Sequence, residues 1–348
     1  MDSESTFRAL AGAAFAWRDP DHPARRESVR ATLAEGNRFT EPALAYAINQ
    51  QMHLVTIAAL ARWKGGREAS NERVVGVLGA GNVPLASFQD YLAVLAMGHS
   101  AVLSESTRSP ALVPAFAAEV ADRGGPPVQV VDHERLFALV EAVIASGSSD
   151  TIQVISERCE SNAIPASCRL LRGTRHGIAV LDGRENPDQR IRWAEDVLLH
   201  EGQGCRNVAI TFAPRGLDVD PYLESLAVFR GTFPAHPGTS AGLKMQQAFL
   251  KAIGASFAQG DGLEFLVSRG DAEPQPPGHV RWVEYDTESE VTGWLDQHAD
   301  EIQVVATRPA LERVVPPRVE RCNLGETQRP PLDWRPDGVD TFDFLARI

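Results

Sequence analysis

Apolar residues recur at helical spacing through the first 68 residues of the chain. In the range 41–64, Leu44, Ile48, Met52 and Val55 fall on one helical face, which predicts a helix with that face buried. Polar residues interrupt the middle of this stretch, so it does not predict a membrane span. The N-terminal region is therefore expected to be helical.

From residue 73 onward, short apolar runs alternate with helical stretches. The runs that predict strands span residues 73–78, 101–103, 128–131, 142–145, 177–181, 208–212, 263–267, 280–283 and 302–305. The stretches that predict helices span residues 84–97, 110–122, 135–139, 149–159, 188–200, 242–253 and 289–299. Strands that alternate with helices are typical of βαβ units. The predicted fold class is therefore α/β with a parallel sheet.

The chain has 348 residues, which is long enough for two domains. We place one boundary near Asp182 and another near Arg308. Residues 1–182 would then hold the N-terminal helices and the first sheet, and residues 183–308 a second α/β domain. Residues 309–348 would form a C-terminal segment that packs back on the body.

Charge and composition restrict the partners. The net charge is −12 at pH 7, which argues against a nucleic-acid partner because phosphate binding needs a basic surface. A few arginines or a helix N-terminus can still bind an anionic cofactor. The start of the chain is acidic and lacks the basic residues of a secretory signal. We therefore expect a cytoplasmic protein without a membrane span.

Four cysteines are present, namely Cys159, Cys168, Cys205 and Cys322. They show no CxxC pair and no Cys/His spacing typical of zinc, so no metal site is expected. So few cysteines in a chain of this length indicate free thiols in a reducing compartment. All but Cys205 lack a distinctive setting and are interpreted as structural.

Cys205 follows Gly202-Gln203-Gly204 and precedes an apolar run. Glycines leave room for a ligand to approach the backbone. A cysteine at such a turn can present its sulfur as a nucleophile and its N–H as an oxyanion donor. Arg206 could help a thiolate electrostatically, whereas His176 and His200 are interpreted as surface or capping residues. The alternative is that Cys205 is a small buried hydrophobic residue.

The turn Gly79-Ala80-Gly81-Asn82-Val83-Pro84 joins a predicted strand to a predicted helix. A dinucleotide fingerprint needs a third glycine where Pro84 stands, so the match to that motif is weak. The Asn82 amide can instead donate to a developing oxyanion. The alternative is a helix cap without chemistry.

Two further turns follow predicted strands. Backbone N–H groups at Gly147 and Ser148 suit a pyrophosphate or the nicotinamide end of a cofactor, but Ser148 could equally be a plain helix cap. Four side chains after the second strand can hold a 2′-phosphate and so favour NADP: Ser104, Ser106, Thr107 and Arg108. Glu105 would instead favour an unphosphorylated ribose, and a polar loop without function is the third reading.

Four short motifs occur in one order: Asn-x-Pro at Asn82, Gly-x-x-x-Val-Leu at Gly98, Gly-Ser at Gly147 and Gly-Gln-x-Cys at Gly202. This order resembles the aldehyde dehydrogenase superfamily. More closely, residues 78–88, 182–208 and 337–345 are similar to the LuxC-type acyl-CoA reductases, a branch that includes the fatty-acid reductase of bacterial bioluminescence. The resemblance runs from about residue 70 to the C-terminus.

The resemblance implies a Rossmann-like coenzyme domain, a second α/β domain that carries the catalytic cysteine, and an active site between them. By position, Cys205 resembles the acyl-accepting nucleophile. Asn82 and the Cys205 N–H resemble the oxyanion hole, and Gly147 and Ser148 resemble the turn beside the coenzyme. Ser104 stands where the family usually has a lysine.

The sequence also departs from the hydrolytic members of the superfamily. Those enzymes use a glutamate in a Glu-Leu-Gly-Gly segment to activate water, and residues 170–175 contain no glutamate. The resemblance therefore implies NADPH-dependent reduction of a fatty acyl-CoA to the aldehyde through an acyl-cysteine. An aldehyde-oxidising dehydrogenase and a non-catalytic acyl-binding subunit are the alternatives. Acyl-CoA is the implied substrate, an acyl-protein synthetase the implied partner, and a homo-oligomer is compatible with the sequence.

Overall fold

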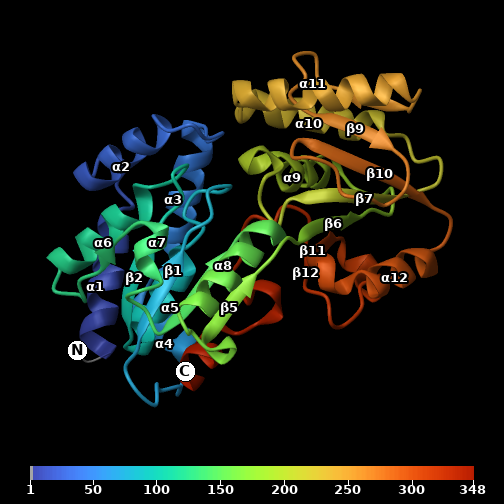
Figure 1. Cartoon of the computed structure of the whole chain (residues 1–348). Helices are drawn as coiled ribbons and strands as arrows, with labels where there is room; N and C mark the ends of the chain where they lie inside the picture. Colours follow the sequence, from blue (N-terminus) through green and yellow to red (C-terminus); the bar gives the residue numbers. More distant parts are fainter. Residues whose placement is uncertain (1–2) are drawn as a thin grey trace. The chain divides into compact units, whose positions relative to one another are not determined.

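Helices and strands alternate through most of the chain in the computed structural model, which describes residues 3–348 (Figure 1). The chain divides into two units. Unit 1 comprises the residues up to Asn37, Leu44–Thr174 and Pro331–Ile348, and unit 2 comprises Arg38–Ala43 and Arg175–Pro330. The main division therefore follows Thr174 rather than Asp182, and the C-terminal segment is shared between the units.

Four helices open the chain: α1 (Ser3–Ala16), α2 (Pro23–Leu33), α3 (Glu41–Leu54) and α4 (Ile57–Lys64). The single helix predicted over residues 41–64 is two helices, because Thr56 is extended and caps the second one. Its Oγ1 accepts a hydrogen bond from the N–H of Ala59 at 3.1 Å. The four apolar residues predicted to face a core from this stretch are all buried.

Unit 1 is built on a five-stranded parallel sheet with the order β3-β2-β1-β4-β5. The strands are β1 (Val74–Leu78), β2 (Ser100–Ser104), β3 (Gln129–Val130), β4 (Ala142–Ser146) and β5 (Arg169–Arg172). The connecting helices are α5 (Phe88–Met97), α6 (Leu112–Asp122), α7 (His133–Leu136) and α8 (Ser149–Ser161). This arrangement confirms the α/β class with a Rossmann-like sheet. The strand order reverses between β1 and β4, and ligands of such sheets bind at the carboxyl ends on either side of that point.

Helix α5 begins later than its sequence pattern predicts. The prediction started it at Pro84, whereas the first helical residue is Phe88. Leu85 has a left-handed backbone with φ of 59°, which a continuous right-handed helix cannot contain. The chain therefore makes a separate turn between β1 and α5.

The C-terminal helix α13 (Thr341–Arg347) is part of unit 1. Arg172 at the end of β5 is buried and forms an ion pair with Asp90 of α5, with Nη1 and Oδ2 2.8 Å apart. The other guanidinium nitrogen of Arg172 donates to the Oγ1 of Thr341 at 2.9 Å. One buried arginine thus ties α5, β5 and α13 together.

Unit 2 contains a mixed seven-stranded sheet with the order β12-β11-β6-β7-β10-β9-β8. The strands are β6 (His176–Val180), β7 (Val208–Pro214), β8 (Phe257–Gln259), β9 (Leu266–Arg269), β10 (His279–Tyr285), β11 (Ile302–Thr307) and β12 (Arg321–Cys322). Its helices are α9 (Pro187–Leu198), α10 (Asp220–Thr232), α11 (Pro237–Ala252) and α12 (Glu288–Gln297). Within the described residues, only β8 and β9 pair in antiparallel fashion.

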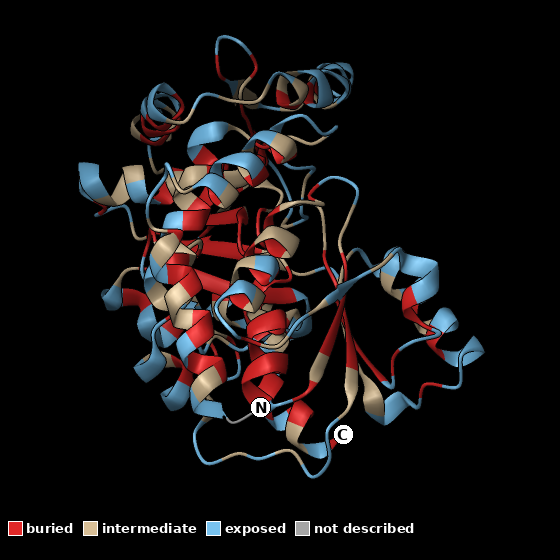
Figure 2. Ribbon diagram, turned by 90° about the vertical axis from the view of Figure 1, so that its left-hand side faces the viewer, coloured by how far each residue is buried: buried red, intermediate tan, exposed pale blue. Residues whose placement is uncertain are grey.

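The ribbon colours of Figure 2 mark the buried residues, which in unit 2 include most of the strands β6, β7 and β11. One face of the unit 2 sheet packs its Ile and Val residues against Leu295 of α12. On strand β10, Trp282 makes edge contacts with Trp193 of α9 and Tyr222 of α10, with ring centroids 6.3 and 5.2 Å apart. Helix α10 was not predicted from the sequence, although it supplies one of these buried rings. None of the helices among residues 3–348 is long and apolar enough to cross a membrane.

Candidate active site

Cys205 occupies a corner of a tight turn directly before β7. The N–H of Asn207 donates to the carbonyl of Gly204 at 3.0 Å, which closes a four-residue turn with Cys205 and Arg206 at its two central positions. Cys205 is partly exposed and is not in a disulfide. Residues 204–207 are called the thiol turn below. A partly exposed thiol at the corner of a turn is the setting expected of a nucleophile.

The chain enters the thiol turn through an unusual left-handed run. Helix α9 ends at Leu198 rather than at His200 as predicted. His200, Glu201 and Gly202 then have φ angles of 54°, 59° and 70°. Left-handed backbone costs a non-glycine residue roughly 1–2 kcal/mol, so the surrounding structure must hold His200 and Glu201 in this conformation. Such strain is concentrated at functional sites more often than elsewhere.

A buried ion pair holds the left-handed run. The carboxylate of Glu201 binds the guanidinium of Arg230 from α10, with N–O distances of 3.0 and 3.2 Å. The Oγ1 of Thr239 from α11 donates to the same carboxylate. All three side chains are buried. The sequence offered no sign of this arrangement, because its three members come from three separate segments.

Arg206, next to the thiol, is buried and paired with a distant segment of unit 2. Its side chain is only 5% exposed. The guanidinium donates to the carbonyl of Thr327 and forms an ion pair with Glu320, with N–O distance 2.8 Å. Arg206 therefore anchors the thiol turn to residues 320–327, and its electrostatic help to a thiolate stays a prediction.

His200 and His176 are also placed differently from expectation. Neither is a surface or capping residue, since each is partly buried. Burial lowers the pKa of His200 to about 4 and also lowers the pKa of His176, so both rings are neutral at pH 7. Within the described residues, the Nδ1 atom of His200 is buried without a hydrogen-bond partner. A neutral imidazole thus lies in the left-handed run, five residues before Cys205.

In unit 1, the loops that follow β1 and β2 lie against each other. A Cβ atom on Gly79 would overlap the carboxylate of Glu105, and one on Gly81 would lie 2.9 Å from the Cβ of Arg108. A Cβ on Gly81 would require Ser106 and Arg108 to shift, whereas at Gly79 only the flexible end of the Glu105 side chain would have to move. The structure therefore brings together two of the segments that the sequence singled out, and Asn82 lies in the first of them, half buried.

The polar side chains at the end of β2 and in the loop after it differ in their exposure. Ser104 is 1% exposed and its Oγ is hydrogen-bonded to the Nδ1 of His133 at 2.9 Å, so its hydroxyl has no surface to offer a ribose. The Ser106 Oγ accepts from the N–H of Arg108 at 3.3 Å. Thr107 and Arg108 are exposed. Within residues 3–348 the guanidinium of Arg108 has no hydrogen bond or ion pair, so it can meet an anion.

Glu105 turns toward the first loop. Its carboxylate accepts a hydrogen bond from the Oγ of Ser87. Burial raises the pKa of Glu105 to about 7, although the bond to Ser87 acts in the opposite direction. The carboxyl group therefore takes up a proton more readily than an ordinary glutamate does.

The turn after β4 leads directly into α8. The Ser148 Oγ accepts from the N–H of Thr151 at 3.2 Å, so Ser148 is the N-cap of that helix. The N–H of Gly147 donates to the carbonyl of Arg172 at 3.1 Å. Ser148 is exposed. The capping interpretation of its hydroxyl is thus supported, and the first turn of α8 lies open at the sheet edge.

These features of unit 1 fit a dinucleotide. The loops after β1, β2 and β4 all follow carboxyl ends of the parallel sheet. Two glycines in the first loop leave room for side chains of the second, and an exposed arginine is available for a phosphate. The candidate site of unit 2 is the thiol turn. Within residues 3–348 no cluster of three or more His, Cys, Asp or Glu residues could hold a metal ion.

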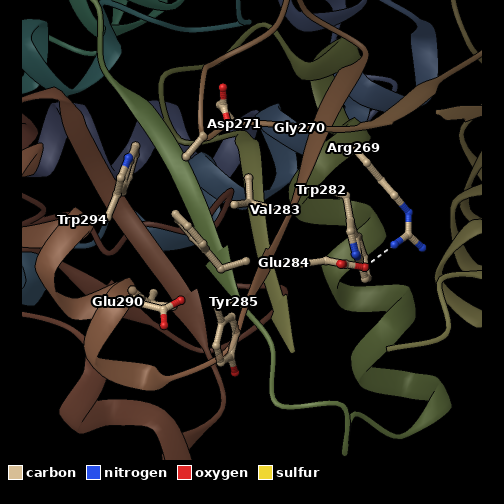
Figure 3. Close-up of a pocket in the computed structure, with 12 residues that line it drawn as sticks. Arg269, Gly270, Asp271, Trp282, Val283, Glu284, Tyr285, Glu290 and Trp294 are labelled. Carbon is tan, nitrogen blue, oxygen red and sulfur yellow. Dashed lines mark hydrogen bonds and ion pairs between the residues drawn. The ribbon is translucent and has the colours of Figure 1, made fainter. Parts of the chain in front are cut away.

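A cavity of about 540 Å³ lies elsewhere in unit 2 (Figure 3). It is lined mainly from β10, α12 and residues 269–272, and its lining includes Asp271 and Glu290. Arg269 and Glu284 form an ion pair beside it. Phe212 in its lining is four residues beyond the start of β7, about 13 Å along the strand. The cavity thus adjoins the carboxyl end of β7, whereas Cys205 precedes the amino end, so it is not the thiol's pocket.

No protein-family model and no curated protein sequence matches the chain. Solved structures do resemble it. An NAD-dependent benzaldehyde dehydrogenase from Corynebacterium glutamicum is 16% identical with a TM-score of 0.70, over 94% of this chain and 83% of that one. A succinic semialdehyde dehydrogenase from Streptococcus pyogenes, in complex with NADP+, is 14% identical with a TM-score of 0.68, over 93% and 82%.

A third similar structure is a cysteine-to-alanine mutant of the indole-3-acetaldehyde dehydrogenase of P. syringae, in complex with NAD+ and IAA. It is 15% identical with a TM-score of 0.67, over 90% of this chain and 74% of that one. Identities this low establish the fold alone. Together with the two sheets described above, these similarities show that the chain has the aldehyde dehydrogenase fold.

Proposed function

We propose that this protein is an NADP-linked reductase that converts an acyl-CoA thioester, of the fatty acyl class, to the aldehyde through an acyl group carried on Cys205. The observation that carries the proposal is the thiol turn. In a chain with the aldehyde dehydrogenase fold, Cys205 stands partly exposed at the corner of a turn directly before β7.

The first step is acyl transfer to the protein. The Cys205 thiolate attacks the thioester carbonyl, the carbon–sulfur bond to CoA breaks, and CoA leaves as its thiolate. The oxyanion formed on the carbonyl needs hydrogen-bond donors. We assign this role to the Cys205 N–H and, on the resemblance of its motif, to the side-chain amide of Asn82.

The acyl group must then leave without hydrolysis. A carboxylate that activates water is the hydrolytic solution in this fold, and the end of β5 carries Arg172-Gly173-Thr174 instead. Arg172 is itself buried and paired with Asp90. The absence of a base in this segment supports release by reduction. Bound NADPH would supply the hydride, after which the bond to the Cys205 sulfur breaks and the aldehyde departs.

The residues proposed to hold the coenzyme all belong to unit 1. The turn at Gly147 and Ser148 would lie beside it, and the loop with Ser106, Thr107 and Arg108 would hold the adenosine end. The guanidinium of Arg108 is exposed and has no partner among residues 3–348, which supports a 2′-phosphate and hence NADP rather than NAD. The buried Ser104 is left out of this set.

The test measures NADPH oxidation with a series of acyl-CoA chain lengths, for the wild type and Cys205→Ala. Intact-mass analysis without NADPH detects the acyl adduct. We expect acyl-CoA-dependent oxidation and a stoichiometric adduct in the wild type, and neither in the variant. An acyl adduct that persists in Cys205→Ala would show that Cys205 is not the nucleophile. Coenzyme binding without turnover, or no coenzyme binding, would point to an acyl-binding subunit.

A second candidate follows from the similar structures, which include aldehyde dehydrogenases. An aldehyde-oxidising enzyme would convert aldehyde and NADP+ to free acid without CoA. Steady formation of acid in the absence of CoA would favour it over the reductase. An acyl-protein synthetase is proposed as the partner on the resemblance alone, and acyl transfer from such a synthetase to Cys205 would be the supporting result.

A further inference from the structure

We infer that Asn207 is the positioning residue for the Cys205 thiol: its carboxamide ties the thiol turn to the C-terminal end of α9. The inference rests on the proposed function, because it concerns the same nucleophile. It adds a residue to the site that neither the sequence motifs nor the resemblance pointed to.

Asn207 uses both ends of its carboxamide. The Oδ1 atom accepts from the N–H of Gly204 at 2.8 Å, across the thiol turn. The Nδ2 atom donates to the carbonyls of Asp196 at 3.0 Å and Leu199 at 2.9 Å, with Val197 more distant at 3.4 Å. The side chain is 3% exposed. An acceptor on one side and two donors on the other is what a carboxamide alone provides.

These contacts meet a need created by the end of α9. The last carbonyls of a helix have no partner within it. Here the chain leaves the helix through the left-handed run and cannot continue the helical pattern. Asn207 satisfies carbonyls at that helix end with its donors while it holds Gly204 with its acceptor. The Asn207 side chain therefore links the thiol turn directly to the end of α9.

The backbone of Asn207 is held from the opposite side. Its carbonyl accepts from the N–H of Gly177 in β6 at 2.9 Å. A Cβ atom on Gly177 would lie 2.8 Å from the carbonyl carbon of Asn207, so the strand and the turn are in direct backbone contact. Asn207 thus joins three elements, namely α9, the thiol turn and β6. Arg206 adds an independent anchor to residues 320–327, so loss of the carboxamide should loosen the turn without detaching it.

The experiment compares Asn207→Ala with a matched control, Asn186→Ala. Asn186 caps the other end of α9, where its side chain accepts from the N–H of Gln189 at 2.9 Å. Removal of such a cap costs about 1 kcal/mol but does not touch the thiol turn. Both variants remove hydrogen bonds at an end of α9. Only Asn207→Ala also removes a hydrogen bond within the thiol turn.

Two readouts are taken at a temperature well below both melting points. The first is the rate of Cys205 alkylation by iodoacetamide from pH 6 to 9, followed on the Cys205 peptide by mass spectrometry. The second is kcat and KM for acyl-CoA. For Asn207→Ala we expect labelling that moves toward the rate and pH dependence of an unstructured cysteine, and kcat lowered about 10–100-fold. KM should stay within about twofold, and the control should match the wild type in both readouts.

Asn207→Asp provides a test within one folded protein. Its ionised carboxylate would face helix carbonyls and repel them, whereas its protonated form can donate one hydrogen bond to them. We therefore expect the activity of Asn207→Asp, relative to Asn207→Ala, to rise as the pH falls from 8 to 6.

Alkylation needs no turnover, so it separates this inference from the proposed function. If the wild type reduces no acyl-CoA while Asn207→Ala still changes Cys205 labelling, the function fails and the positioning role stands. If Asn207→Ala labels like the wild type, or Asn186→Ala lowers kcat as much, the positioning role is overturned.

Discussion

Asp196 and Thr327 are joined by two hydrogen bonds, from the N–H and the Oγ1 of Thr327 to the Asp196 Oδ1 at 3.1 and 2.7 Å. The other carboxylate oxygen accepts from the N–H of Gly325 at 2.6 Å. The carbonyl of Thr327 in turn accepts from Arg206. Asp196 of α9 therefore fixes the segment to which Arg206 anchors the thiol turn. Asn207 connects the same turn to the end of α9 directly.

Asp196 should make stability fall as the pH rises. Burial raises its pKa to about 7, against the opposing effect of its hydrogen bonds. An unfolded aspartate titrates near 4, so between pH 4 and 7 the folded state binds more protons and the free energy of unfolding decreases with pH. In Asp196→Asn this contribution is absent. The free energy of unfolding, measured with urea at pH 5 and 7.5, should decrease more for the wild type than for the variant at the higher pH. If the difference in this free energy between the two proteins is the same at both pH values, the raised pKa of Asp196 is contradicted.

The buried histidines act in the opposite direction. Burial lowers the pKa of His279 to about 4, and that of His200 to about 4 as well. An unfolded histidine titrates near 6.5, so between pH 6.5 and 4 the unfolded state binds more protons. Their stabilising contribution is complete above about pH 6.5 and is lost as the pH falls toward 4. In His279→Gln, the melting temperature should fall less steeply between pH 6.5 and 4 than in the wild type. The control is His53→Gln at an exposed position, which should show the same dependence on pH as the wild type.

Removal of only one partner of the Glu201–Arg230 pair should lower the free energy of unfolding more than removal of both. Both side chains are buried and in close contact. Arg230→Leu leaves a buried carboxylate without its partner, and we expect it to lower the free energy of unfolding by about 3–5 kcal/mol. Adding Glu201→Leu should recover part of that loss, because no charge then remains buried. A double-mutant cycle based on urea unfolding measures these changes in stability. A double variant less stable than Arg230→Leu would contradict the buried ion pair between Glu201 and Arg230.

Arg108 should decide the coenzyme preference, because we propose that its guanidinium binds the 2′-phosphate. Its guanidinium is exposed and has no partner within the described residues. Arg108→Ala should weaken NADPH binding about tenfold, with little change for NADH, because only one of them carries the phosphate. Fluorescence titration gives both dissociation constants. Ser104→Ala is the control: its buried hydroxyl bonds His133, so the ratio of the two constants should not move.

Local pattern was sufficient for much of the fold. The alternation of strands and helices predicted both α/β units, and the helical spacing of Leu44 and Ile48 predicted their burial, because hydrophobic periodicity reports which face of an element meets a core. The boundaries were less accurate. Strand β5 was missed, and α5 starts late because Leu85 takes a left-handed backbone, a conformation that no residue preference marks at a leucine.

The candidate site divides in the same way. Cys205 among glycines was visible in the sequence because the chemistry of a turn and a thiol is local. Its supports were not, since Arg206 finds Glu320 at a separation of 114 residues and Asp196 finds Thr327 at 131. By itself, therefore, the sequence determined the α/β class and the residue proposed as nucleophile. Only the tertiary structure decided that Arg206 pairs with Glu320, that Ser104 is buried and that Asn207 contacts both the turn and α9, because a polar side chain takes its role from the partners that folding brings to it.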